Sequence, residues 1–231
     1  MIRRPDLFIM NRLLKSMVSS SLHRGGQLPI PSDTPVVYAA GSDPDRLLLI
    51  GSGPVAGIGV TSHQLGIGGQ LARRISTLTG RGVDLELMGS DDLVIEQAQE
   101  LLDATDLTRF DAIVLMVGIG ETIGLDDIRR WRTHIRRLLE TASAAPQVFV
   151  VGITDFSPYI EVPRLFARAM RRHGIRLNEV TESVAATIPG TQFVPFAPER
   201  PDHFTPFGSV KVYERWANAM APAIASGLDP A

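Results

Sequence analysis

The sequence LLLIGSGPVAGIGV, residues 47–60, joins a short apolar run to a turn rich in glycine. The apolar run has the composition of a buried strand, and the glycines after it let a ligand approach the backbone closely. Gly51, Gly53 and Gly57 spell G-x-G-x-x-x-G, a spacing that can hold the pyrophosphate of a dinucleotide after a strand. Taken alone, the stretch leaves this function open beside others, and the rest of the chain must decide.

From residue 35 onward, short apolar runs alternate with longer segments of helical periodicity. This alternation is typical of repeated βαβ units, and it predicts an α/β fold of three layers, α/β/α, around a mostly parallel five-stranded sheet. The predicted principal strands are residues 46–50, 83–88, 112–117, 148–153 and 192–196. The predicted helices are residues 63–79, 91–103, 125–143, 160–187 and 208–225.

Two segments are expected along the chain: residues 1–34, with a helix and a connector, and a domain of residues 35–231. Apolar residues recur at helical spacing within 5–20 and predict an amphipathic helix that docks on the domain. The proline-rich stretch 26–45 reads as an extended connector around a short strand, Val36–Ala39. The N-terminal apolar run is too short and too interrupted for a signal peptide or a membrane span, so we expect a cytoplasmic protein, with peripheral membrane contact of the 5–20 helix as the less favoured alternative to docking.

Composition excludes several classes of function. The formal charge of −2, with 44% hydrophobic and 21% charged residues, is that of an ordinary soluble globule, and no nucleic-acid partner is expected. The chain has no cysteine, which excludes disulfides, thiolate metal sites and cysteine nucleophiles. No histidine has a partner at metal-ligand spacing, so we expect no metal, and no cofactor is expected.

Four segments in order resemble the sequence blocks of the SGNH (GDSL-type) hydrolases. In residues 47–60, Gly51 matches the glycine of the first block, Ser52 stands where its Asp belongs and Gly53 where its nucleophilic Ser belongs. After the next strand, Gly89 and the serine that follows resemble the second block, whose glycine supplies a backbone N–H to the oxyanion hole.

The third and fourth blocks are also recognisable. Gly118-Ile119-Gly120-Glu121 resembles Gly-x-Asn-Asp, with Gly120 in place of the oxyanion Asn. Asp202-His203-Phe204-Thr205-Pro206 resembles Asp-x-x-His-Pro, with Asp202 retained and Thr205 where the catalytic His belongs. The resemblance runs from about residue 35 to residue 225, and it implies a flavodoxin-like sheet with the site at the carboxyl ends of the strands.

A dinucleotide site fails its next test. That fold places an acidic residue at the tip of the second strand to hold the ribose hydroxyls. Here the strand ends Glu86-Leu87-Met88-Gly89, so Glu86 lies inside the strand and not at its tip. We therefore favour the hydrolase-like interpretation over the dinucleotide one.

The residues needed for ester hydrolysis are mostly replaced. A serine esterase needs a hydroxyl nucleophile, an imidazole base, an Asp that orients it and N–H donors for the oxyanion. The sequence therefore predicts a catalytically degenerate protein that binds an ester, acyl or carbohydrate ligand, or a protein partner, at the former active site. The predicted ligand-binding residues are Gly53, Gly89, Gly120, Glu121 and Thr205.

An active esterase or acyltransferase is the alternative, with Ser52 as nucleophile and His203 as base beside Asp202. Geometry argues against this pair, because a shift of one residue along a strand turns a side chain to the opposite face. A shift of two residues in a turn moves an imidazole by several ångströms. A third alternative is a structural partner subunit, with an exposed apolar surface on the helix of residues 5–20.

Other polar residues have simpler interpretations at helix starts. Ser62 reads as a helix N-cap, and His63 as a residue of the first turn. Ser90-Asp91-Asp92 and Asp126-Asp127 each precede a predicted helix and are expected to cap it. Glu121 has no evident capping role in the sequence, which leaves it either as a ligand-binding carboxylate or as a solvated side chain.

Overall fold

A computed structural model describes residues 28–159, 161–198 and 208–228 of the chain. Within these ranges the strands form one six-stranded sheet in the order β1-β3-β2-β4-β5-β6. The strands are β1 (Val36–Ala39), β2 (Ser42–Ser52), β3 (Arg81–Ser90), β4 (Ala112–Met116), β5 (Gln147–Val151) and β6 (Thr191–Val194).

The predicted three-layer fold is confirmed, with one strand more than expected. Strands β3, β2, β4, β5 and β6 pair in parallel, and their order is the flavodoxin-like one. The short strand of the connector joins the same sheet: β1 pairs antiparallel with β3, with Val37 opposite Leu85. Both side chains are fully buried in one apolar cluster, and this burial stabilises β1 at the edge of the sheet.

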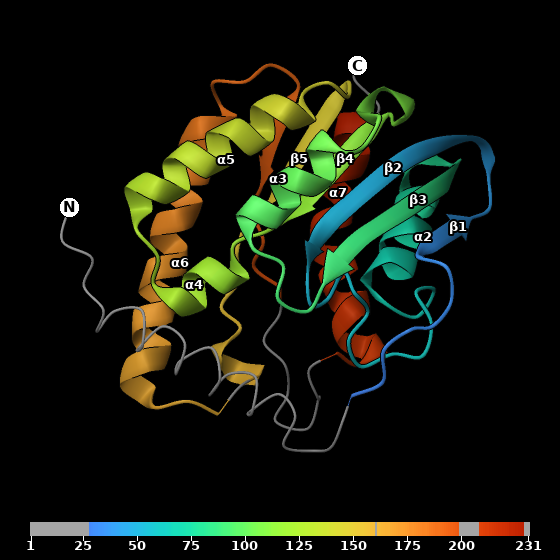
Figure 1. The fold of residues 1–231 in the computed structure, drawn as a ribbon. Coiled ribbons are helices and arrows are strands. Elements are labelled where there is room, and N and C mark those ends of the chain that lie inside the picture. The colour runs from blue at the N-terminus through green and yellow to red at the C-terminus, as the bar shows by residue number, and fades with distance from the viewer. Residues whose placement is uncertain (1–27, 160, 199–207, 229–231) are drawn as a thin grey trace.

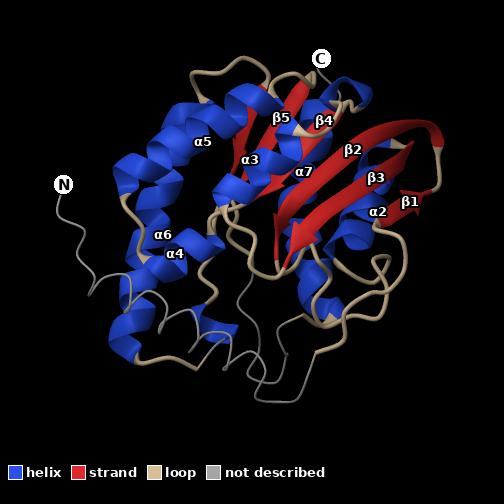
Figure 2. Cartoon of the chain, in the orientation of Figure 1, coloured by secondary structure: helices blue, strands red, loops and turns tan. Residues whose placement is uncertain are grey.

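Helices cover both faces of the sheet (Figures 1 and 2). One face packs against α2 (Ile67–Thr79) and α7 (Val210–Leu228), and its apolar cluster includes Leu47, Leu49 and Trp216. The other face packs against α3, α5 and α6, and its cluster includes Leu48 and Ile50. These three helices and the short α4 are α3 (Ile95–Asp103), α4 (Ile119–Gly124), α5 (Ile128–Ala142) and α6 (Arg164–Ala185).

The five predicted helices all begin later in the structure, by four residues for α2, α3 and α6, three for α5 and two for α7, and α4 was not predicted. Helix α2 begins after an extended Gly66, and α3 begins after an extended Val94. Segment 91–94 is therefore outside α3, and the prediction that Asp91 and Asp92 cap this helix is wrong. Helix α4 follows Gly118, whose φ of 106° only glycine adopts readily.

The N-terminal segment cannot be compared with its prediction, because the expected helix of residues 5–20 lies outside the described residues. Among the helices in the described part of the chain, none is both long and apolar enough to span a membrane.

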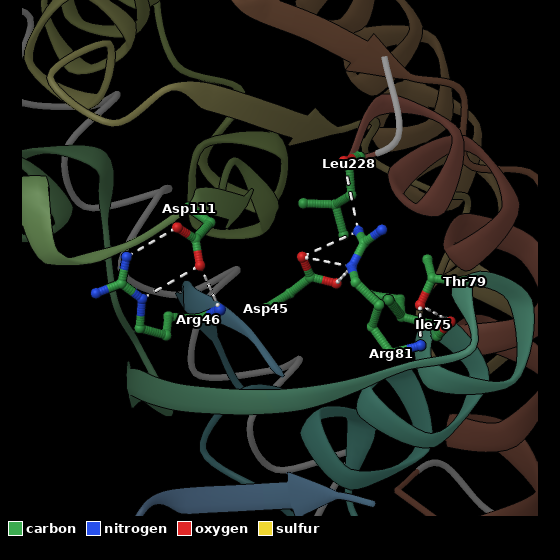
Figure 3. A network of polar contacts seen from close by, with 7 residues as sticks. All are labelled: Asp45, Arg46, Ile75, Thr79, Arg81, Asp111 and Leu228. Carbon is green, nitrogen blue, oxygen red and sulfur yellow. Dashed lines mark hydrogen bonds and ion pairs between the residues drawn. The ribbon is translucent and has the colours of Figure 1, made fainter. Parts of the chain in front are cut away.

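Polar contacts join the amino-terminal ends of β2 and β3 to the end of α7 (Figure 3). The Arg81 guanidinium donates to both carboxylate oxygens of Asp45, at 3.0 to 3.1 Å, and to the backbone oxygen of Leu228 at 3.4 Å. Beside it, the exposed Arg46 pairs with Asp111. These ion pairs lie at the edge of the sheet opposite the strand ends that carry the hydrolase-like blocks.

Candidate functional site

The first three hydrolase-like blocks meet at the carboxyl edge of the sheet. Strand β2 lies between β3 and β4, and its Gly51 is opposite both Gly89 of β3 and Met116 of β4. A methyl group added at Gly51 would lie 2.5 Å from the backbone oxygen of Met116, so only glycine fits there. The sequence predicted this convergence, because parallel strands bring their carboxyl ends to one edge.

At the nucleophile position, the backbone of Gly53 is already hydrogen bonded. The Gly53 N–H donates to the backbone oxygen of Ser90 at 3.0 Å, so it is not free to bind an oxyanion in this structure. A Cβ at Gly53 would have 3.6 Å to its nearest neighbour, Ile58, but φ is +39°, a backbone region that disfavours side chains. Gly53 as a ligand contact stays a prediction.

Ser52, the alternative nucleophile, is buried. Its residue is 4% exposed, and its Oγ makes no hydrogen bond within the described residues. By the two-residue period of a strand, Ser52 faces the same helical layer as Leu48 and Ile50. The hydroxyl therefore points into the protein, and a substrate would reach it only after local opening.

Gly89 of the second block lies at a large cavity. This cavity, of about 950 Å³, lies between the connector before β1, the end of β3 and helix α3. A methyl group on Gly89 would come within 2.7 Å of the Gly51 oxygen, which explains the need for glycine. Gly89 as a ligand contact stays a prediction, and its position beside the cavity is consistent with it.

The third block forms α4. Gly120, at the position of the oxyanion Asn, is half-buried, and a methyl group there would lie 3.4 Å from Cγ1 of Val94. Glu121 is 3% exposed, and its Oε1 accepts a hydrogen bond from the Ile95 N–H at 2.7 Å. Glu121 thus caps α3 from another element, a role that the sequence did not reveal because the two residues are far apart in the chain. A ligand contact at Gly120 or Glu121 stays a prediction.

Burial changes the titration of Glu121. Loss of solvation raises its pKa above the ordinary value of 4.5; the Ile95 N–H opposes this, and the nearby charges of Asp126 and Glu96 add to it. Its second oxygen, Oε2, is buried and has no hydrogen-bond partner within the described residues. A carboxylate in this position is costly when ionised, because nothing replaces the water lost by Oε2.

We expect Glu121→Gln to change how stability depends on pH. An acid whose pKa is raised by folding holds its proton more tightly in the folded state. The free energy of unfolding therefore falls as pH rises from 4.5 through the raised pKa. In Glu121→Gln the amide oxygen still accepts from the Ile95 N–H, but the side chain does not titrate, so the free energy of unfolding should not fall in this way. Urea unfolding at a series of pH values measures the difference. The exposed Glu179→Gln serves as control, and equal pH profiles for wild type and Glu121→Gln would contradict the prediction.

The other helix-start interpretations have mixed outcomes. Asp127 is confirmed as the N-cap of α5, since its carboxylate accepts from the N–H groups of Arg129 and Arg130 at 2.9 Å. His63 is not in the first turn of α2, which begins at Ile67, and Ser62 is not its N-cap. The turn before the helix is held by a contact with the connector.

That contact pairs His63 with Asp33. Nδ1 of His63 lies 2.7 Å from an oxygen of Asp33, and the His63 backbone N–H also donates to this carboxylate. Burial alone would raise the pKa of Asp33, but the hydrogen bonds and charge of His63 lower it below the ordinary value. Sequence reasoning missed the pair, because Asp33 lies in a proline-rich connector and no local pattern links it to His63.

The fourth block lies outside the described residues, so the predictions for Asp202, His203 and Thr205 are not tested. The described chain resumes at Gly208, which touches the glycine turn: a methyl group on Gly59 would lie 2.5 Å from the Gly208 oxygen. The Tyr213 hydroxyl donates to the Ile58 oxygen in the same turn. The first block is thus in direct contact with the start of α7.

A second cavity, of about 390 Å³, lies beyond the carboxyl ends of β5 and β6. Its lining includes Asp155, Tyr159 and Asn178. The Asn178 side chain bonds both the N–H and the oxygen of Ile153, so it holds the end of β5 in place. Within the described residues, no group of three or more His, Asp or Glu side chains is arranged to hold a metal ion.

Three solved structures illustrate the proteins that share this architecture. TesA superposes with a TM-score of 0.60 at 16% identity, over 78% of this chain and 98% of that chain. Axe2, an acetylxylan esterase from Geobacillus stearothermophilus, gives 0.53 at 13% identity, over 83% and 96%. A GDSL-like lipase from Bacteroides ovatus gives 0.55 at 18% identity, over 80% of this chain and 53% of that chain.

The chain has the SGNH-hydrolase fold. The sequence itself matches no protein-family model and no curated protein. At these identities the likeness establishes the fold alone, and the SGNH fold hosts its chemistry in specific side chains, not in the sheet. What this chain does must therefore be argued from its own residues.

Proposed function

We propose that this SGNH-fold protein is catalytically degenerate and binds a small ester, acyl or carbohydrate ligand at the carboxyl edge of its sheet. The observation that carries the proposal is the state of the first block. Gly53 has no side chain to attack a carbonyl, and its N–H is bonded to Ser90. Without a nucleophile, the covalent route of a serine esterase is closed.

The oxyanion site is weakened as well. Gly120 offers no side-chain amide at the position of the oxyanion Asn, and the loss of one such donor typically costs about 10²–10³ in rate. Because Gly53 also offers no nucleophile, this edge of the sheet lacks two of the groups that a serine esterase needs.

A binding role is supported by the cavity beside Gly89. Its volume of about 950 Å³ is at the upper end of the range for small-molecule sites, about 300–1,000 Å³. Its walls are largely apolar, as in most such sites, with a few polar groups among them. The apolar lining residues are Ile30, Pro31, Pro35, Val55, Ala56, Leu87, Met88, Leu93 and Leu101.

An active esterase that uses Ser52, His203 and Asp202 is the second candidate. The observation in its favour is that the similar structures include esterases. Against it, the Ser52 hydroxyl is buried and faces a helical layer. This mechanism therefore requires β2 to open at its carboxyl end before each turnover.

Hydrolysis of short-chain p-nitrophenyl esters separates the two candidates. We expect the wild-type protein to stay at the background rate, together with Ser52→Ala and His203→Ala. Turnover by wild type that disappears in Ser52→Ala or His203→Ala would show that the displaced pair is active and the proposal is wrong. The double variant Gly53→Ser, Thr205→His restores the two missing groups, and activity in it would show that the site still binds these esters.

A further inference from the structure

The wall of the cavity beside Gly89 carries a mostly buried imidazole whose orientation is fixed by a carboxylate. His63 lines the cavity, and its side chain is 9% exposed. Nδ1 faces the Asp33 carboxylate at 2.7 Å, and Nε2 is not among the fully buried atoms without a partner in the described residues. An imidazole fixed through one nitrogen beside a largely apolar cavity can offer its other nitrogen to a ligand.

The pair with Asp33 fixes the chemistry of that nitrogen. An ionised carboxylate only accepts hydrogen bonds, so the proton of the neutral ring resides on Nδ1. Nε2 is then an acceptor. The backbone N–H of His63 donates to the same carboxylate, which holds the ring and the turn together. This is the arrangement by which a carboxylate sets the tautomer of a histidine elsewhere in proteins.

The charges of the lining restrict the ligand further. Asp91 and Glu100 are exposed residues of the cavity lining, which among the described residues contains no Lys or Arg. Asp33 adds a third carboxylate behind His63. These charges would repel an anionic head group, and the described lining has no Lys or Arg to offset the repulsion.

We propose that His63, held by Asp33, anchors a ligand with an apolar body and a neutral or cationic head group that carries O–H or N–H donors. The apolar body lies against the walls formed by residues such as Leu87 and Leu93, and the head group donates to Nε2. This inference rests on the proposed function, because it names the ligand class of the same cavity. A hydroxyl and an ammonium group share the required chemistry, and the experiment distinguishes them.

Binding of hexanol, hexylamine and hexanoate tests the proposal, since the three probes share one apolar body. The measurement is chemical-shift titration of the full-length protein in mildly alkaline buffer. We expect hexanol or hexylamine to bind at least about tenfold more tightly than hexanoate, because the carboxylates of the lining repel the charge of hexanoate. Whichever of the two binds more tightly identifies the head group.

Variants then locate the anchor. His63→Phe keeps an aromatic ring and removes the acceptor, and it should weaken hexanol binding about five- to tenfold, the value of one hydrogen bond. His134→Phe, the same substitution on α5 away from this cavity, should leave binding unchanged. Asp33→Asn keeps His63 but no longer fixes its tautomer, so it should weaken hexanol binding less. This variant tests the anchor even if His63→Phe folds poorly. Leu101→Trp, at the cavity wall, should weaken all three probes.

The outcomes separate this inference from the proposed function. If hexanol binds and Leu101→Trp blocks it while His63→Phe and Asp33→Asn have no effect, the anchor is wrong and binding in the cavity stands. Equal binding of hexanoate and hexanol would also overturn the anchor. If no probe binds, the ligand class is wrong. Ester turnover by the wild-type protein would contradict the proposed function and leave the role of His63 to these titrations.

Discussion

Gly59→Ala should lower the free energy of unfolding by about 3 kcal/mol, the sum of a left-handed backbone and an overpacked contact. Gly59 has φ of +91°, and its added methyl group would lie 2.5 Å from the Gly208 oxygen and 2.8 Å from the Gly208 Cα. These are backbone atoms, so no side chain can rotate away. Relief requires the glycine turn and the start of α7 to separate.

Gly80→Ala is the matched control. Gly80 ends α2 with φ of +72°, and nothing lies within 4 Å of an added methyl group. This variant therefore has the backbone cost alone, about 1 kcal/mol. Urea unfolding followed by tryptophan fluorescence measures both variants. Equal losses would show that the turn and α7 do not press against each other, contrary to the structure.

Asp45→Ala should also lower the free energy of unfolding by about 3 kcal/mol. Asp45 and Arg81 have side chains only 12% and 22% exposed, and Asp45 is in contact with Arg81 through three hydrogen bonds. Removal of one partner from a buried pair leaves the other charge poorly solvated, which typically costs about 3–5 kcal/mol. The loss should extend to α7, because Arg81 also bonds Leu228 (Figure 3).

Arg46→Ala controls for the loss of an ion pair as such. Arg46 and Asp111 lie next to the Asp45 pair, but their side chains are 56% and 39% exposed. Exposed pairs contribute little because water solvates each partner alone. Chemical denaturation of both variants should therefore give a far smaller loss for Arg46→Ala. Similar losses would mean that burial of the Asp45 pair has no effect on its strength.

The contact between the glycine turn and Gly208 bears on the proposed function. The contact of Gly59 with Gly208 joins the first block to the segment that precedes α7, and it is independent of any catalytic group. The contact at the carboxyl edge thus needs no side chain at Gly53. This separation of scaffold from chemistry is consistent with the proposed binding role.

The fold was largely predictable from the sequence. Parallel strands buried on both faces need continuous apolar runs, and residues 46–50, 112–117 and 148–153 show them. The same runs placed Gly51, Gly89 and the third block at one edge of the sheet. The absence of a nucleophile at Gly53 is likewise a property of the sequence, because a glycine has no side chain in any fold.

The state of the site was decided by tertiary structure. The capping of α3 by Glu121 and the pair of His63 with Asp33 join residues that no local pattern connects. The burial of Ser52 and the hydrogen bond from Gly53 to Ser90 depend on how neighbouring strands end. Apolar periodicity is a local property and so determines the strands and helices. Which polar groups meet depends on the packing of distant segments, and only the folded chain determines that.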